Sequence, residues 1–231
     1  MIFNMPVMKK ENNILYNQIS LIHAQIPVSY YTVNEINNLF VLSTGSYTLT
    51  NGNYNATSFK TMFLNLLGST FSMTLDVSTG KYTLSCTSSF TILSSTTCYK
   101  ILGLEKSKSY TVSSSLTFPY PCNFLSVNRL KIKSSVFKTN NLDSNSNGHS
   151  HLLATIPVDS SQYGLITYNN LVNFKNIFSN TDITFIDITI TDESDNILNF
   201  NGIDVHLTLQ IDSIIQDYEN NNDLQELINT L

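Results

Sequence analysis

Hydrophobic and polar residues alternate most regularly near the C-terminal end of the chain. Between positions 203 and 212 the sequence IDVHLTLQID places aliphatic residues on one parity and polar residues on the other. Successive side chains of a β-strand point to opposite faces, so this stretch predicts a strand with one dry and one wet face. We expect Leu207, on the aliphatic face, to lie in the core, where Leu207→Asp would cost several kcal/mol.

A second alternating stretch covers residues 184–191, and the polar run DESDN at 192–196 separates it from the first. Asp, Ser and Asn side chains bond back to nearby backbone, so this run predicts a turn between two long strands. Phe185 breaks the parity of the earlier strand. Its position indicates either a bulge or a strand that is buried on both faces.

Shorter runs of the same kind recur through the rest of the chain. The first predicted strand, at 14–26, places Ile19 and Leu21 on one face and Ile22, Ala24 and Ile26 on the other. Residues 55–67 instead repeat apolar residues at helical spacing, and residues 96–104 predict one helical turn that Gly103 ends. Residues 169–179 should be an irregular connection with Phe174, Ile177 and Phe178 turned inward. The pattern predicts an all-β sandwich of about eight to ten antiparallel strands with one or two short inserted helices.

This pattern defines a single domain over residues 14–212, with one segment outside it at each end. Residues 1–13 are expected to form an N-terminal arm, and residues 213–231 an acidic tail with a helical pattern. Isolated termini gain nothing by exposing apolar side chains to water, so we expect the apolar side chains of both terminal segments to be buried at contacts between subunits. They are Ile2, Phe3, Met5, Val7 and Met8 in the arm and Leu224, Leu227, Ile228 and Leu231 in the tail.

Composition favours a protein that is packed against neighbours. Only 13% of the 231 residues are charged, against ~25% in an average soluble domain. The net charge of −5 argues against a general nucleic-acid binder, which needs a clustered basic field. The one local basic cluster, Arg129, Lys131 and Lys133, alternates along a predicted strand and should occupy a solvated face.

Cysteine usage and hydropathy point to an intracellular product. Cys86, Cys98 and Cys122 are odd in number and lack C-x-x-C spacing, so we expect reduced thiols. No apolar run approaches the ~18 residues of a membrane span. The first residues lack the apolar core of a signal peptide.

Candidate chemistry in the sequence is weak. Residues 143–148 (DSNSNG) match the opening of a calcium-binding EF-hand loop, but the twelfth position holds Ala154 where a bidentate Glu is needed. The carboxylates of Asp192, Glu193 and Asp195 crowd one turn without a partner base. The histidines, at 23, 149, 151 and 206, show no spacing of a closed metal site. We therefore expect no catalytic residues, no metal, no cofactor and no enzymatic activity.

Several segments resemble one family when they are taken in order: ISLIHAQIPVSYYTVNEINN, GNYNATSFKTMFLNLL, the hairpin FSMTLDVSTGKYTLSC, and the closing ITITDESDNILNFNGIDVHLTLQI. This order resembles the penton or minor capsid proteins of large eukaryotic DNA viruses, virophages and polinton-like elements. One departure is Asp195-Asn196, where the family often has Gly-Asn.

The resemblance implies a jelly-roll sandwich with a structural role in an icosahedral shell, most simply as the pentamer at a vertex. It further implies a location in the virion, assembly in the cytoplasm of the infected cell, and contacts with other copies and with the neighbouring major capsid protein.

Two alternatives stay open at this stage. The chain could be a trimeric minor capsid protein, because the sequence does not distinguish fivefold from threefold assembly. It could also be a receptor-binding jelly-roll module of a fibre, for which exposed aromatic residues beside Asp and Asn would be expected. Tyr30, Tyr31 and Tyr163 are the candidates for such a site.

Overall fold

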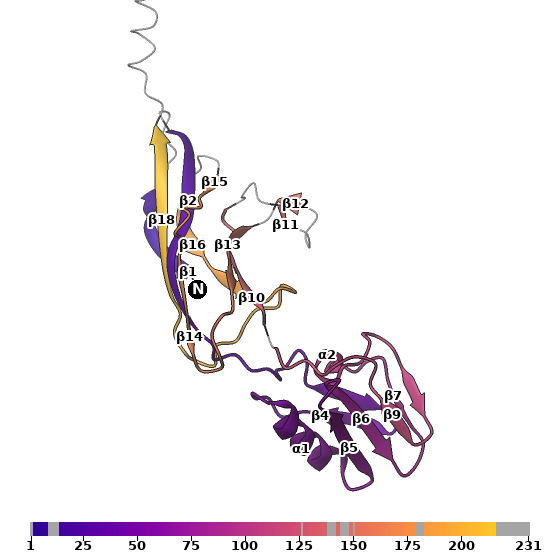
Figure 1. The fold of residues 1–231 in the computed structure, drawn as a ribbon. Coiled ribbons are helices and arrows are strands. Elements are labelled where there is room, and N and C mark those ends of the chain that lie inside the picture. Colours follow the sequence, from indigo (N-terminus) through magenta and orange to yellow (C-terminus); the bar gives the residue numbers. More distant parts are fainter. Residues whose placement is uncertain are drawn as a thin grey trace, which may run out of the picture. The chain divides into compact units, whose positions relative to one another are not determined.

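Two compact units make up the computed structural model: unit 1 is Met1–Ser29 with Val127–Leu231, and unit 2 is Tyr30–Ser126 (Figure 1). The structure describes residues 2–8, 14–125, 127–137, 142–143, 148–149, 151–178 and 183–215, with backbone alone for 2–8, 142–143 and 148–149. The sequence predicted one domain over 14–212, whereas the contacts gather residues 30–126 into a unit of their own. The physical reason is that the apolar residues of this segment pack on one another.

Unit 1 is built from antiparallel strands. They are β1 (Ile2–Met8), β2 (Ile14–Pro27), β10 (Arg129–Lys133), β11 (Leu142–Asp143), β12 (Gly148–His149), β13 (Leu152–Pro157), β14 (Leu165–Asn169), β15 (Asn176–Phe178), β16 (Ile183–Asp187), β17 (Thr189–Thr191) and β18 (His206–Ile215). In the first sheet, β2 is central, with β18 along one side and β14 and β15 along the other. A second sheet has the order β13-β10-β17, and β1 pairs with β16.

The two sheets of unit 1 share a core. The Phe137 ring contacts the Phe178 ring of β15 at a centroid distance of 4.8 Å. The buried Asn176 side chain donates from Nδ2 to the Leu153 carbonyl of β13 at 3.0 Å. An apolar contact and a satisfied buried amide thus join the sheets as a sandwich.

A bulge in β2 changes which residues face this core. Thr208 pairs with His23 and Leu209 with Leu21, so Ile22 is an extra residue opposite β18. One inserted residue shifts the parity of everything beyond it. Ile19, Leu21, Ala24 and Ile26 are therefore all buried, contrary to the two-face division predicted from the sequence, and Ile22 is exposed.

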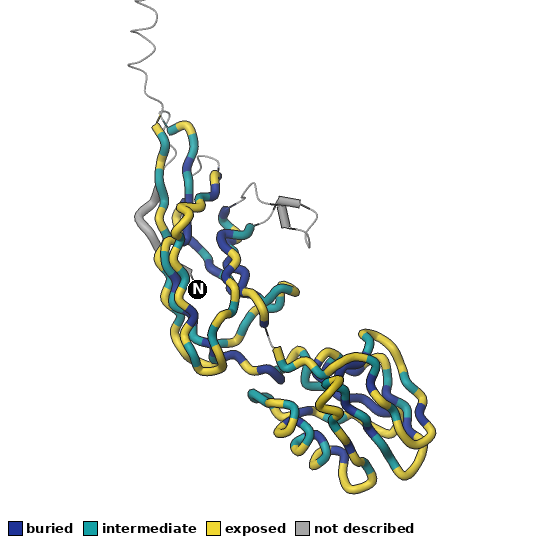
Figure 2. The backbone as a smooth tube through the Cα atoms, viewed as in Figure 1, coloured by how far each residue is buried: buried dark blue, intermediate teal, exposed yellow. Residues whose placement is uncertain are grey.

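The aliphatic face of β18 differs from the sequence prediction. The strand exists, but none of its ten residues is buried; Leu207, Leu209 and Ile211 are half-buried (Figure 2). They share a face with the buried residues of β2. Because β18 lies at the side of its sheet, this face is incompletely covered. The aliphatic side chains of β18 therefore lie at the edge of the core and not at its centre.

We therefore expect Leu207→Asp to destabilise unit 1 by about 1–2 kcal/mol, less than a full core substitution, because little apolar area returns to water. Leu21→Asp provides the contrast, since Leu21 is 2% exposed and would bury an unpaired charge. Urea denaturation of both variants measures the difference. Equal losses in the two variants would contradict the exposed position of β18.

The earlier strand of the predicted hairpin is divided at Ile188 into β16 and β17, which pair with different strands. Ile186, Ile188 and Ile190 are buried, as their common parity predicted. Phe185 is 43% exposed, which excludes burial on both faces. Phe185 pairs with Asn4, and the register shift of the β1–β16 pairing adds residues between Asn4 and Met8 of β1, so it does not place a bulge at Phe185.

The N-terminal segment also differs from its prediction as an arm outside the strand pattern. The backbone of β1 pairs with β16, with Ile2 opposite Asp187 and Met8 opposite Ile183. Pairing satisfies backbone groups that a free arm would leave to water, and it covers the side of β16.

Unit 2 contains two antiparallel sheets, ordered β4-β3-β7-β8 and β5-β6-β9, and two helices. The elements are β3 (Leu39–Leu42), β4 (Gly45–Thr48), α1 (Ala56–Leu67), β5 (Phe71–Asp76), β6 (Lys81–Cys86), β7 (Phe90–Ile92), α2 (Tyr99–Leu102), β8 (Tyr110–Val112) and β9 (Ser115–Thr117). Asn55 caps α1, accepting from the Ser58 N–H at 2.9 Å, while its own N–H donates to Ser58 Oγ. The helix buries Phe59, Phe63 and Leu67.

The predicted class is confirmed: antiparallel strands dominate, with helices at the two predicted places. The strands are shorter and more numerous than the eight to ten expected. Gly103 ends α2 in the left-handed conformation, as predicted, with φ +83. A Cβ there would lie 2.1 Å from the Tyr120 carbonyl oxygen, so only Gly fits. Within the described ranges no helix is long and apolar enough to span a membrane.

Candidate functional site

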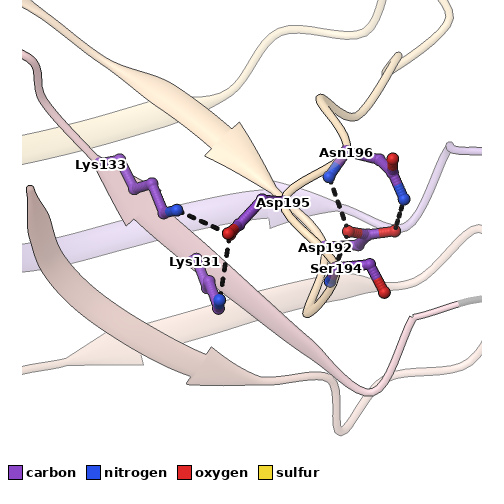
Figure 3. A network of polar contacts seen from close by, with 6 residues as sticks. All are labelled: Lys131, Lys133, Asp192, Ser194, Asp195 and Asn196. Carbon is purple, nitrogen blue, oxygen red and sulfur yellow. Dashed lines mark hydrogen bonds and ion pairs between the residues drawn. The ribbon is translucent and has the colours of Figure 1, made fainter. Parts of the chain in front are cut away.

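The basic cluster of β10 forms an ion-pair network with the turn that follows β17 (Figure 3). Lys131 Nζ lies 3.0 Å and Lys133 Nζ 2.6 Å from Asp195 Oδ1. Lys131 is only 6% exposed and Lys133 is half-buried, while Arg129 is exposed. The predicted solvated face is therefore wrong for Lys131 and Lys133, whereas Arg129 is exposed as predicted. The sequence could not show it, because the carboxylate that compensates Lys131 lies 64 positions away.

Each carboxylate of the turn accepts a hydrogen bond or forms an ion pair within unit 1. Asp192 accepts from the Ser194 and Asn196 N–H groups at 2.8 and 2.9 Å and from Asn196 Nδ2 at 2.8 Å (Figure 3). Glu193 Oε2 accepts from the Asn128 N–H at 3.4 Å. Asp195 adopts a left-handed φ of +67. This arrangement fixes a tight turn against β10; its carboxylates do not converge on a substrate site.

Asp187, at the end of β16, anchors the segment that follows β10. Its Oδ1 accepts from Ser134 Oγ and from the Ser135 N–H, both at 2.9 Å, and from the Val136 N–H at 3.4 Å. Burial alone would raise the pKa of Asp187, but these hydrogen bonds together outweigh burial and lower the pKa. The hydrogen bond from Lys133 likewise lowers the pKa of Asp195, although partial burial alone would raise it. The hydrogen bond from Lys131 lowers this pKa further.

These lowered pKa values predict an acid-sensitive unit 1. A carboxyl with a folded pKa below its unfolded value of about 3.9 stabilises the fold above that value, and the contribution is lost as pH falls through the folded pKa. We expect stability to drop below about pH 4, and to drop less steeply in Asp187→Asn. Denaturant midpoints at pH 7, 4 and 3 measure this. The exposed Asp204→Asn is the control, and an equal pH dependence in both variants would refute the assignment.

The residues considered for metal binding do not form a ligand set. Ala154 is a buried residue of β13, and His151 Nδ1 contacts the Phe137 carbonyl at 3.0 Å. His23 and His206 pair with Thr208 and Gln25 on the outer face of the first sheet. Asp143 and His149 have only their backbone described, in β11 and β12, and residues 144–147 lie outside the described residues. Among the described side chains no three potential ligands come together.

The tyrosines considered for a receptor site differ in exposure. Tyr30 is buried, at 3% exposure, and Tyr31 is 36% exposed. Tyr163 is 81% exposed and has a φ of +65, a conformation that bulky residues rarely adopt. Its N–H donates to the Val28 carbonyl at 3.0 Å, which holds this backbone in place.

The interface residues predicted from the sequence cannot be placed by their side chains. Ile2, Phe3, Met5, Val7 and Met8 belong to β1, of which the backbone alone is described. Leu224, Leu227, Ile228 and Leu231 lie outside the described residues. The interface assignment therefore stays a prediction.

An apolar surface that the sequence did not predict lies on the loop between β14 and β15. Leu171 is 91% and Val172 85% exposed. Phe174 and Ile177 are also exposed, at 45% and 44%, so their predicted inward orientation is wrong, whereas Phe178 is buried as predicted. A strand pattern cannot reveal such a loop, because the exposure depends on how it leaves the sheet.

Unit 2 has an open groove beside α1. Met62 and Leu66 contribute apolar surface, and the remaining lining is hydroxyl and amide: Thr50, Ser58, Thr61 and Asn65. Its volume is about 670 Å³, and it is shallow and largely open to solvent. The lining carries no charge, which suits a neutral, partly apolar partner.

Comparison with known proteins finds structural similarity alone; neither a family model nor a curated protein matches the sequence. The chain is similar to the mavirus penton protein, in a crystal structure of its selenomethionine form, at 12% identity and a TM-score of 0.46, covering 93% of this chain and 91% of that chain. It is also similar to a chain of the Sputnik virophage in a cryo-EM structure at 3.5 Å, at 12% identity and a TM-score of 0.41, covering 91% of each.

Proposed function

We propose that the chain is a structural capsid protein of jelly-roll type that forms the pentamer at the vertices of an icosahedral shell. The observation that carries this proposal is the backbone at the positions of the family motif. The motif often has Gly where this chain has Asp195, and Asp195 takes the left-handed φ of +67 that favours Gly. At this position the chain has Asp in place of the Gly of the motif, but its backbone has the left-handed conformation that Gly adopts most readily.

Other pieces of the motif fall on matching elements. The T-G-K turn joins β5 to β6, with Gly80 at a φ of +67. The GNYN segment leads into α1 through the Asn55 cap. The FNG segment precedes β18, with Gly202 at a φ of +79. These placements support the resemblance with backbone geometry in addition to sequence.

The surface also suits assembly. Large apolar side chains are exposed in both units, among them Val77, Leu125, Leu171, Val172 and Ile197. A contiguous exposed apolar patch marks an interaction site, and Leu171 and Val172 are an adjacent pair of this kind, at 91% and 85% exposure. We propose that the apolar residues of the two termini, from Ile2 to Met8 and from Leu224 to Ile228, join subunits, and that the ring contacts the neighbouring major capsid protein in virions assembled in the host cell, with no catalysis and no bound metal.

Negative-stain class averages of the purified protein test the fivefold ring. We expect fivefold averages for the unmodified chain and loss of the ring in Leu227→Asp/Ile228→Asp, with the circular dichroism spectrum unchanged. Asn220→Asp/Asn221→Asp adds the same charge to the tail at polar positions and serves as the control. Threefold averages would instead favour a trimeric minor capsid protein.

A receptor-binding role is the second candidate, favoured by Tyr163. An exposed aromatic ring on a backbone held in a rare conformation is a feature of binding loops, and the polar residues Asp159 and Gln162 precede it in the sequence. A glycan array with the purified protein and with Tyr163→Ala tests this role. Binding that requires Tyr163 would support it, and no binding by the unmodified protein would remove it.

A further inference from the structure

We propose that the first sheet of unit 1 continues from copy to copy, with β18 of one copy pairing in parallel beside β14 of the next. This inference rests on the proposed ring and names the strand contact that joins its subunits. In the described part of the chain, β18 pairs with β2 alone, and β14 pairs with β2 alone from the opposite side. The sheet therefore has an open edge at each side. Each edge presents a row of backbone N–H and C=O groups, for which another strand is the matching partner.

The free edge of β18 lacks the features that keep exposed edges from pairing. Natural edge strands are short, or carry Lys, Pro or a bulge. β18 has ten residues and no Lys, Arg or Pro, and its one carboxylate, Asp212, is paired with Lys175 at 2.7 Å. The two register shifts between β2 and β18 both place their extra residue, Leu15 and Ile22, in β2. The backbone of β18 is thus uninterrupted, and its free edge is regular.

The free edge of β14 has similar properties. The strand sequence, LITYN, contains no charge and no Pro. Tyr168, on its inner face, is half-buried, as are Leu207 and Leu209 on the inner face of β18. Each edge therefore leaves apolar surface of the inner face partly open to water. A strand added at either edge covers this surface, which is favourable.

The common partner β2 determines how the two edges meet in a ring. β14 and β18 both run antiparallel to β2, so they run in the same direction. In a ring whose axis follows the strands, neighbouring copies then form a parallel pair, with evenly spaced hydrogen bonds. Cyclic symmetry rotates each copy about this axis without a shift along it. Residues of β18 and β14 that pair with the same residue of β2 therefore lie at the same height.

The resulting register places side chains of one kind beside each other. On the inner face, Leu207 of one copy lies beside Tyr168 of the next, since both pair with Ala24. The outer face brings exposed polar residues together: His206 with Thr167, which share Gln25, and Thr208 with Asn169, which share His23. β15 continues the same side of β2, and by the same rule it faces residues 211–213 of β18. Side-chain chemistry and backbone pairing thus agree across the contact.

A double-cysteine variant tests this register. In Thr208→Cys/Asn169→Cys the two thiols of one chain are separated by two strand spacings, or ~10 Å, which exceeds the Cα separation of about 4.4–6.8 Å in a disulfide. The same positions on neighbouring copies lie on adjacent strands, within this range. Oxidised glutathione accepts the two electrons released as two thiols join. We expect a ladder of linked chains up to the closed ring on a non-reducing gel.

Matched variants control for random oxidation. In Thr208→Cys/Leu165→Cys the second thiol lies on the same face of β14 but four residues away, or about 13 Å, so no ladder should form. The unmodified chain, with its three free thiols at Cys86, Cys98 and Cys122, should also give none. A ladder of equal strength in the Leu165 variant would overturn the register.

Charge substitution gives a second readout that needs no oxidant. Thr208→Lys/Asn169→Lys should reach half-assembly at roughly tenfold higher concentration, because like charges meet across the strands. Thr208→Lys/Asn169→Asp should assemble like the unmodified chain, since opposite charges meet there. Both positions are exposed, so unit 1 stays folded in both variants.

The outcomes separate the strand contact from the ring. Fivefold class averages without a cysteine ladder overturn the strand contact and leave the ring standing. A ladder that closes at three chains supports the strand contact and refutes the pentamer. A monomeric unmodified protein refutes both.

Discussion

Replacing Phe59 by Ala should lower the free energy of unfolding of unit 2 by about 3–5 kcal/mol, the usual cost of deleting a buried aromatic side chain. Phe59 is fully buried and stacks on Phe63 with ring centroids 5.5 Å apart. Phe124 and Tyr54 pack on it edge to face at 5.3 and 6.1 Å. No neighbouring side chain can fill the cavity without disturbing these contacts, so the loss should be near the upper end of the range.

Hydrogen exchange read out by mass spectrometry measures this loss in each unit. Amides of residues 30–126 should exchange faster in Phe59→Ala, while amides of β2 and β18 keep their protection. Leu66→Ala is the matched control on the same helix, because Leu66 is 36% exposed and should cost less than about 1 kcal/mol. Equal deprotection of both units would show that the two units unfold as one.

Asp195→Asn should destabilise unit 1 by about 2 kcal/mol, because it removes the charge that compensates the buried Lys131. The full cost of breaking a buried ion pair is larger, but the Asp195 side chain is 38% exposed, and water screens part of the interaction. Asn tolerates the left-handed conformation of this position, so the substitution tests the charge and not the backbone.

A double substitution separates the two contributions. Lys131→Met with Asp195→Asn removes both charges and should recover most of the stability, since no buried ammonium is left. Urea denaturation of the single and double variants gives the comparison. A double variant that is less stable than Asp195→Asn would contradict the assignment of the cost to the Lys131 charge.

Local features of the fold could be predicted where one segment contains the whole signal. The apolar spacing at 55–67 predicted α1, and Gly103 predicted the end of α2. The alternation at 203–212 predicted β18 as a strand but not its burial, because burial depends on what the opposite sheet covers. A surface strand and a core strand can share one pattern.

The remaining features depend on partners that are distant in the sequence. The bulge at Ile22 is defined by its pairing with β18, and the burial of Lys131 by Asp195. The apolar tip at Leu171 and Val172 has the composition of a core segment, so only the path of the loop shows its exposure. The unit at 30–126 interrupts unit 1 in the chain, and no change of composition marks its ends.

The mass of the native protein in solution, measured by light scattering after size-exclusion chromatography, tests the proposed vertex role most directly. A vertex pentamer predicts a single species of five chains of 25.9 kDa each that persists on dilution. A species of one chain at every concentration, or of three chains, would contradict the pentamer.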